Sequence, residues 1–176
     1  MRIAACQMVS TLNVEKNIQT ALGLIRSAAQ SGAELIVLPE NFACMPQSDQ
    51  ELLSIAETPN EGPIQKAMSQ IAKDEQIWLV AGTIPLKSGN HQHFIDACIV
   101  YDPSGEAVTR YDKIHLFQFE RDNEQYNESA TTEPGNQAKN FSMDSWDGIW
   151  KVGLGICFDL RFPESVSYTH LTLPTT

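Results

Sequence analysis

Hydrophobic positions near the start of the chain form two short continuous runs separated by a helical stripe. Residues 2–8 (RIAACQM) and 34–39 (ELIVLP) are short apolar runs and predict β-strands. Between them, apolar residues recur about every 3.6 residues over 14–29, with Asn13 as an N-cap and Gly32 just past the end, so this segment predicts an amphipathic helix. The strand–helix–strand order predicts a parallel pair of strands with a right-handed crossover.

The rest of the chain repeats these two kinds of pattern. The predicted elements are a helix over 63–75, a strand over 77–84, a hairpin over 94–101 and 107–112, and a final strand over 150–158. Residues 117–137 are polar and show no apolar periodicity, so they predict a long loop, which in a compact domain usually has a function. The order of the elements predicts one α/β domain.

Residues 165–176 (SVSYTHLTLPTT) differ in character from the chain before them. They contain no charged side chain and four threonines, and they match, codon for codon, one reading frame of a transposon adapter used in sequencing libraries. A natural C-terminal tail is the alternative. We interpret 165–176 as a non-native tail and assign the domain to residues 1–164, cut in mid-domain. On that interpretation we expect the chain to aggregate through an unpaired sheet edge and to show little activity.

The charge balance and the cysteine pattern argue against several classes of function. With 12 Lys+Arg against 22 Asp+Glu, a net charge of −10 and a pI near 4.7, no basic face is available to bind nucleic acid. The longest apolar run, residues 77–86, is too short to cross a membrane, and no secretory signal begins the chain. The cysteines at positions 6, 44, 98 and 157 form no CxxC pair. We expect a cytoplasmic globular protein with no metal and no cofactor.

Three side chains that could carry chemistry each stand at the end of a predicted strand. Glu40 follows 34–39, Lys113 follows 107–112, and Cys157 lies where an apolar strand runs into the sequence FDLRFP. Taken singly, each has an ordinary explanation: a solvated carboxylate, a surface lysine and a small buried thiol. Taken together, the three side chains could act as a general base, a cation that stabilises an oxyanion, and a nucleophile.

The segments around these residues resemble the three motifs of the carbon–nitrogen hydrolase (nitrilase) superfamily. They are PENF at 39–42, YDKIHLF at 111–117 and GLGICFDLRFPE at 153–164, and the start AACQM at 4–8 fits as well. They occur in the order and at the approximate spacings of the family, so the resemblance covers residues 1–164. It implies an α/β fold, the nitrilase-like αββα four-layer sandwich, incomplete at the C-terminus, and a parent protein that is a homo-oligomer.

The resemblance also implies a Glu–Lys–Cys catalytic site. Glu40 would be the general base, Lys113 would stabilise the oxyanion, and Cys157 would form a thioester, with the backbone N–H of Phe158 completing the oxyanion hole. The family commonly adds a second glutamate in the loop after the lysine, and Glu128 is the best match. The same predicted loop also contains Glu120, Glu124 and Glu133.

The residues that follow Cys157 point to the amidase branch of the family. Nitrilases tend to have Trp-Glu after the nucleophile, whereas this chain has FDLRF, which is similar to omega-amidases and deaminated-glutathione amidases. The implied partners are therefore water and a small-molecule amide that carries a carboxylate, with no nucleic acid and no membrane. Arg161 is a candidate for binding that carboxylate, and a salt bridge to Glu164 or another nearby acid is its alternative role. His115 is expected to be structural.

Three alternative functions remain open at this level. Nitrile hydrolysis would use the same three side chains. A catalytically silent scaffold on the same fold would leave Cys157 inert. A metal or redox module would use cysteines together with His91 and His93, although these residues form no short-spaced ligand set.

Overall fold

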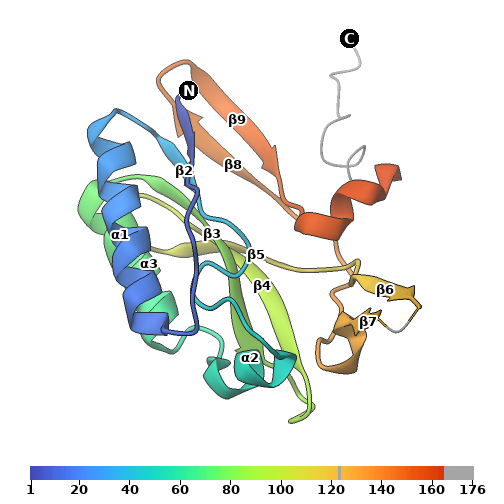
Figure 1. The fold of residues 1–176 in the computed structure, drawn as a ribbon. Helices are drawn as coiled ribbons and strands as arrows, with labels where there is room; N and C mark the ends of the chain where they lie inside the picture. Colours follow the sequence, from blue (N-terminus) through green and yellow to red (C-terminus); the bar gives the residue numbers. More distant parts are fainter. Residues whose placement is uncertain (123, 165–176) are drawn as a thin grey trace.

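A computed structural model describes residues 1–122 and 124–164 as a mixed α/β fold (Figure 1). Within these residues the main sheet has the order β1-β2-β3-β4-β5, in which β1, β2 and β3 are parallel and β4 and β5 continue antiparallel. The strands are β1 (Ile3–Ala5), β2 (Leu35–Val37), β3 (Trp78–Lys87), β4 (Phe94–Tyr101) and β5 (Ala107–Asp112). The predicted parallel pair and the predicted hairpin are therefore confirmed, with β1 shorter than expected.

Two helices cover one face of this sheet, α1 (Val14–Gln30) and α3 (Pro63–Glu75) (Figure 1). Both predicted helices are confirmed, and Asn13 caps α1 as expected. The side chain of Asn13 accepts a hydrogen bond from the backbone N–H of Lys16 at 2.9 Å, and Pro63 opens α3, where a missing N–H has no consequence. A short helix that the sequence did not predict, α2 (Asp49–Ile55), lies between β2 and α3 in the chain.

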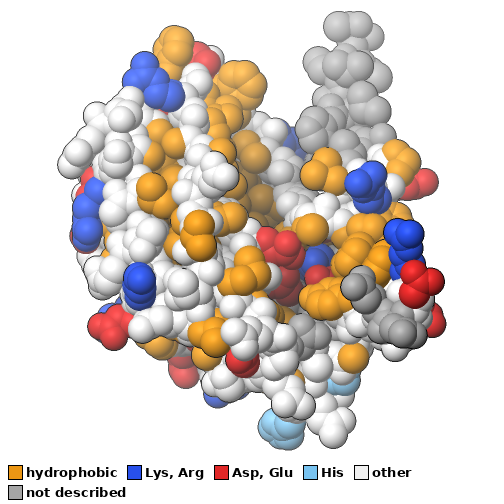
Figure 2. All heavy atoms as spheres, viewed as in Figure 1, with side chains coloured by type: hydrophobic (Ala, Val, Ile, Leu, Met, Phe, Trp, Pro, Cys, Tyr) orange, Lys and Arg blue, Asp and Glu red, His pale blue; other side chains and the backbone are white. Residues whose placement is uncertain are grey.

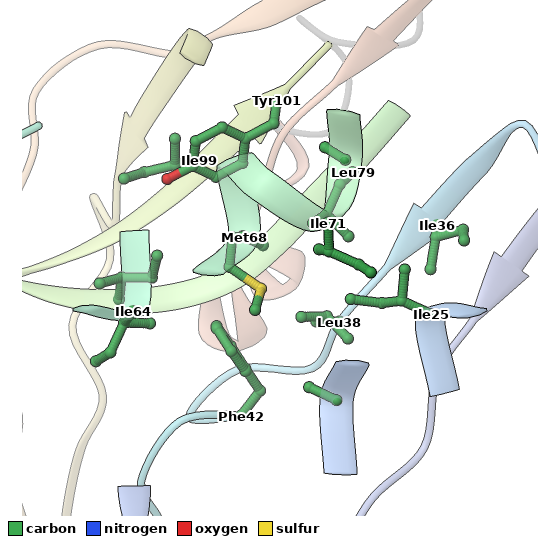
Figure 3. Packing of buried hydrophobic residues seen from close by; sticks show 14 of the residues in the cluster. Ile25, Ile36, Leu38, Phe42, Ile64, Met68, Ile71, Leu79, Ile99 and Tyr101 are labelled. Carbon is green, nitrogen blue, oxygen red and sulfur yellow. The ribbon is translucent and has the colours of Figure 1, made fainter. Parts of the chain in front are cut away.

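The main hydrophobic core lies between these helices and the sheet. Ile25 of α1, Met68 of α3 and Leu79 of β3 are fully buried there, and Figure 3 shows them pointing toward one another. Alternate residues of the central strands face opposite sides, so that Leu79 packs against the helices while Val80 packs against the other face. This burial on both faces explains the continuous apolar runs in the sequence.

A second antiparallel pair, β8 (Asn140–Ser145) and β9 (Gly148–Gly153), covers the other face of the sheet. Phe141 and Met143 of β8 are buried against it, and the ring of Phe141 stacks on Trp78 with centroids 5.5 Å apart. The part of the chain that the structure describes thus forms helix, sheet and strand layers. Within that part, no helix is both long and apolar enough to span a membrane.

Two predicted segments differ from the structure. The strand predicted over 150–158 ends at Gly153, and Cys157–Arg161 instead form a 3₁₀ helix, η2, because the Asp159 carboxylate accepts a hydrogen bond from the Ile156 N–H at 2.9 Å and starts a turn. The loop predicted over 117–137 contains the hairpin β6 (Gln118–Arg121) and β7 (Glu124–Asn127), followed by η1 (Glu128–Ala130). The interpretation of 165–176 as a non-native tail falls outside the described residues.

A glycine in β3, Gly82, allows the backbone of β3 to approach the backbone of Pro39, the residue before Glu40. Gly82 has φ +33° at an irregularity in the pairing of β3 with β4, and a Cβ atom there would lie 2.0 Å from the carbonyl oxygen of Pro39. Only glycine permits both the positive φ and this approach. The irregularity at Gly82 therefore fixes the position of the backbone that leads to Glu40.

Replacement of Gly82 by alanine should lower the free energy of unfolding by about 2–4 kcal/mol, because the backbone must move and a strained φ is imposed. The measurement is urea denaturation followed by circular dichroism. Gly23→Ala is the matched control: Gly23 lies in α1 with nothing within 4 Å of its Cβ position, so helix propensity should make that variant more stable by about 0.5–1 kcal/mol. Equal stabilities for the two variants would contradict this account.

Candidate active site

The ammonium of Lys113 lies buried between two carboxylates. Its Nζ atom donates hydrogen bonds to Oε1 of Glu40 at 2.8 Å and to Oε1 of Glu128 at 3.0 Å, and its side chain is 1% exposed. Burial alone lowers the pKa of this ammonium, but the hydrogen bonds and charges of Glu40 and Glu128 outweigh it and raise the pKa above its ordinary value. Lys113 is therefore a fixed cation at neutral pH.

Each partner of Lys113 is positioned by a different element. Glu40 lies three residues after β2 ends at Val37. The next residue, Asn41, has φ +56° and donates its N–H to Oγ1 of Thr83 at 3.0 Å. Glu128 begins η1, and its second carboxylate oxygen accepts the N–H of Phe117 at 2.7 Å. Among the acids of the predicted loop whose side chains the structure describes, Glu128 is thus the one that reaches Lys113.

Cys157 stands on a sharp turn beside this cluster. It is the first residue of η2 and has φ +45°, which is strained for a residue with a side chain. The carboxylate of Glu40 is close enough to act on its thiol, and the residue is exposed, whereas Cys44 and Cys98 are buried. Desolvation and then the negative charge of Glu40 raise the pKa of the Cys157 thiol, although Lys113 opposes this. The thiol therefore holds its proton at rest and faces a carboxylate that can accept it.

A hollow opens next to Cys157. It has a volume of about 680 Å³ and is lined by Phe117, Cys157, Phe158, Leu160 and Arg161. Figure 2 shows acidic and basic side chains gathered in a recess near the middle of one face, bordered by hydrophobic side chains. The Phe117 and Phe158 rings meet edge to face with centroids 5.3 Å apart. An apolar wall with a guanidinium and a thiol is suited to a small organic anion.

The other singled-out residues lie apart from this cluster or support it. Cys98 is buried in the cluster between the sheet and the β8–β9 pair, and Cys6 is half-buried against the core between the helices and the sheet. Among the described residues, no group of His, Cys, Asp and Glu side chains is placed to hold a metal ion, and His93 contacts Asn90 instead. In the same part of the chain no ion pair joins Arg161 to Glu164, so that alternative for Arg161 is not seen.

Sequence reasoning missed two buried carboxyl groups near the site, Asp96 and Asp159. Asp96 lies on β4, is 8% exposed and is hydrogen-bonded to Thr83, and its backbone carbonyl accepts the N–H of Lys113 at 3.0 Å. Asp159 lies in η2 and is 2% exposed. The available signal for Asp96 was a carboxylate inside the otherwise apolar run FIDACIV, since acids are almost never buried without a partner.

Fold and site together define a class: an α/β protein that gathers a thiol, an ammonium and two carboxylates at the ends of its strands. Residues 2–171 match the carbon-nitrogen hydrolase family, and the chain belongs to that family.

Curated relatives of this chain include enzymes named as amidases. It is 37% identical to nitrilase homolog 2 of Dictyostelium discoideum over 93% of this chain and 48% of that protein. It is 34% identical to omega-amidase NIT2 of Pongo abelii over 93% of this chain and 56% of that protein. It is 35% identical to deaminated glutathione amidase of Synechocystis over 94% of this chain and 60% of that protein. The chain therefore spans about half the length of the curated relatives it matches.

Solved structures show the same fold. The NitFhit protein of C. elegans superposes with a TM-score of 0.82 at 30% identity, over 95% of this chain and 40% of that one. An amidase variant from Nesterenkonia sp. AN1, which carries the result of Michael addition of acrylamide at its active-site cysteine, gives a TM-score of 0.76 at 26% identity, over 94% of this chain and 61% of that one. The predicted nitrilase-type α/β fold is therefore confirmed.

Cys157 should react with iodoacetamide at least about tenfold faster than Cys6, Cys44 or Cys98 at pH 8, because its thiol is exposed and the others are shielded. Mass spectrometry of tryptic peptides over a time course measures the four rates. Cys157→Ser should remove the fast phase alone, and unfolding in urea should make the four rates similar. Equal rates in the folded chain would favour the catalytically silent scaffold.

The free energy of unfolding of the chain should depend on pH because of the titration of Asp96. Burial, followed by the charge of Glu40, raises the pKa of Asp96 to about 7, against the opposing effects of Lys113 and Thr83. The unfolded carboxyl has a pKa of about 3.9. Folding therefore takes up a proton between these values, and the contribution of Asp96 to stability is fully present below pH 4 and is lost as the pH rises through about 7.

Asp96→Asn removes this titration. The free energy of unfolding of the variant, relative to that of the native chain, should rise by up to about 4 kcal/mol between pH 4 and pH 8. Urea denaturation of both proteins at each pH measures the difference, in which the other titrating groups largely cancel. A difference that stays constant across this range would mean that Asp96 does not titrate there.

Proposed function

We propose that this chain contains the active site of an amidase that hydrolyses a small carboxylate-bearing amide through a thioester on Cys157. The observation that carries the proposal is the placement of one buried ammonium, Lys113, at hydrogen-bond distance from both Glu40 and Glu128. The Glu40 carboxylate also acts on the Cys157 thiol. Membership of the carbon-nitrogen hydrolase family supports it. An active-site cysteine in the Nesterenkonia amidase supports the role of Cys157.

In the first half of the reaction, Glu40 accepts the thiol proton while the Cys157 sulfur bonds to the amide carbonyl carbon. The electron pair of the C=O double bond moves to oxygen, and this oxyanion receives hydrogen bonds from Lys113 and from the N–H of Phe158, which at the start of η2 has no acceptor within its own helix. When the carbonyl re-forms, the C–N bond breaks. The nitrogen leaves with the proton from Glu40, as ammonia or an amine.

In the second half, water replaces the departed amine. Glu40 accepts a proton from water, and the water oxygen bonds to the thioester carbon. The C–S bond then breaks, the carboxylic acid is released, and the Cys157 sulfur takes back the proton. Glu128 keeps Lys113 in place and charged throughout, because it holds both the ammonium and the N–H of Phe117. The sum consumes one water and needs no cofactor.

The hollow beside Cys157 supports the proposed substrate class. Its wall is aromatic, and its polar group is the guanidinium of Arg161, which can bind a carboxylate with two parallel hydrogen bonds. Two curated relatives are named omega-amidase and deaminated glutathione amidase, and these names denote enzymes that act on amides of this chemical class. An α-keto acid amide that carries a carboxylate fits this hollow.

The test is ammonia release from matched panels of amides and nitriles, with and without a carboxylate. The uninterrupted parent protein should hydrolyse the carboxylate-bearing amides. In that protein Cys157→Ala and Glu40→Gln should each reduce kcat by at least about 1000-fold, because each removes a group that takes part in bond making. Hydroxylamine added to the native reaction should yield the hydroxamate, which reports a thioester. Nitrile turnover at a comparable rate would overturn the assignment as an amidase.

The second glutamate has a matched control in the same hairpin region. Glu128→Gln should reduce kcat by about 10- to 100-fold, because the charge that holds Lys113 is lost while the side chain keeps its shape. Glu120→Gln, on the exposed strand β6, should leave kcat within about twofold of native. Equal effects of the two substitutions would remove Glu128 from the site.

A further inference from the structure

The carboxylate of Asp159 is shared among four donors that belong to two distant segments. Its Oδ2 atom accepts the hydroxyl of Tyr111 at 2.7 Å and the N–H of Ile156 at 2.9 Å. Its Oδ1 atom accepts the backbone N–H of His115 at 3.0 Å and lies 2.7 Å from Nδ1 of the same residue. Because a carboxylate only accepts, Nδ1 of His115 carries a hydrogen in this contact.

These donors bracket the two segments that the proposed reaction needs. Tyr111 and His115 stand two residues before and two residues after Lys113, and Ile156 directly precedes Cys157. One carboxylate thus joins the segment of the cation to the turn of the nucleophile. The His115 ring also stacks on Phe162, just past the end of η2, with centroids 3.6 Å apart and planes 10° apart.

A purely local role does not account for this arrangement. An acid at the third position of a helical turn often accepts the N–H of the capping residue, and Asp159 does so with Ile156. That contact would be satisfied by an exposed carboxylate. The carboxylate of Asp159 is instead 2% exposed and receives its remaining hydrogen bonds from residues 44 and 48 positions away.

We propose that Asp159 is a positioning residue that sets the distance between the Cys157 thiol and the Lys113 ammonium. The proposal rests on the proposed function for the role of these two groups. Cys157 occupies a strained conformation with φ +45°, so its turn needs an external tie to stay in place, and the bonds of Asp159 supply it. Asp159 does not touch the substrate. It acts through Ile156 on one side and through Tyr111 and His115 on the other.

Asp159→Asn keeps the size of the side chain and replaces one acceptor oxygen by an NH₂ group that faces donors. We expect kcat for amide hydrolysis to fall by about 100-fold with KM changed less than about threefold, because a shift of about 1 Å between reacting groups costs on that order. A second readout needs no substrate. The pH midpoint of Cys157 alkylation by iodoacetamide should fall toward that of an ordinary thiol as the turn leaves Glu40.

Asp102→Asn is the matched control. Asp102 clamps the β4–β5 turn with Oδ1, which accepts the N–H groups of Ser104 and Glu106 and the hydroxyl of Ser104. Its loss should lower the melting temperature as the loss of Asp159 does, but leave kcat and the alkylation midpoint of Cys157 unchanged. Native kcat and a native midpoint in Asp159→Asn would overturn the proposal.

Tyr111→Phe provides the second variant if Asp159→Asn does not fold. It removes one of the four bonds and keeps a buried ring, so it should show the same two changes with kcat reduced by about threefold to tenfold. A folded Tyr111→Phe with native kcat and midpoint would overturn the proposal. If the uninterrupted parent protein hydrolyses no amide, the proposed function fails, while the alkylation midpoints of these variants still decide whether Asp159 positions Cys157.

Discussion

The arrangement of this protein depends on the burial of one ammonium between two carboxylates. Removing Lys113 from water is unfavourable unless its charge is paired and its hydrogen-bond donors are satisfied. Glu40 and Glu128 meet both conditions, and they come from the end of β2 and from η1, while Lys113 itself follows β5. Three separate chain segments must therefore converge before the ammonium has both of its carboxylate partners. The glycine bulge at Gly82 and the backbone bond from Lys113 to Asp96 hold two of those segments to the sheet.

How much of the fold could be predicted depends on how strongly each element is buried. The predictions of the helix over 63–75 and of the central strands were correct because these elements pack on apolar neighbours along their whole length. The sequence pattern did not predict the hairpin β6–β7, because the residues of β6 are exposed and show no alternation of apolar and polar positions. Strand β8 does alternate, but it contributes only Phe141 and Met143 to the core, too few to stand out from a loop.

The candidate site shows a similar division. The sequence selected Glu40, Lys113, Cys157 and Glu128 as candidates because they stand in segments that resemble known motifs. The structure places Glu128 beside Lys113. Asp159 was read only as part of a motif. Its donors lie 44 and 48 residues away, and no local pattern encodes contacts of that range. The positive φ of Cys157 was hidden for the same reason, since the turn depends on that carboxylate.

The charges around Cys157 also determine whether its side chain rests as a thiol or as a thiolate. Among the described residues of the cluster, Glu40 and Glu128 both pair with the ammonium of Lys113, and a thiolate would add another negative charge. Burial and the Glu40 carboxylate raise the pKa of the Cys157 thiol, so the resting form keeps its proton. This differs from a cysteine paired with an imidazolium, in which the cation lowers the thiol pKa and the thiolate forms in advance. In the reaction we propose, the proton leaves as the sulfur bonds to carbon and the negative charge moves to the carbonyl oxygen beside Lys113, so that electrostatics couple deprotonation to attack.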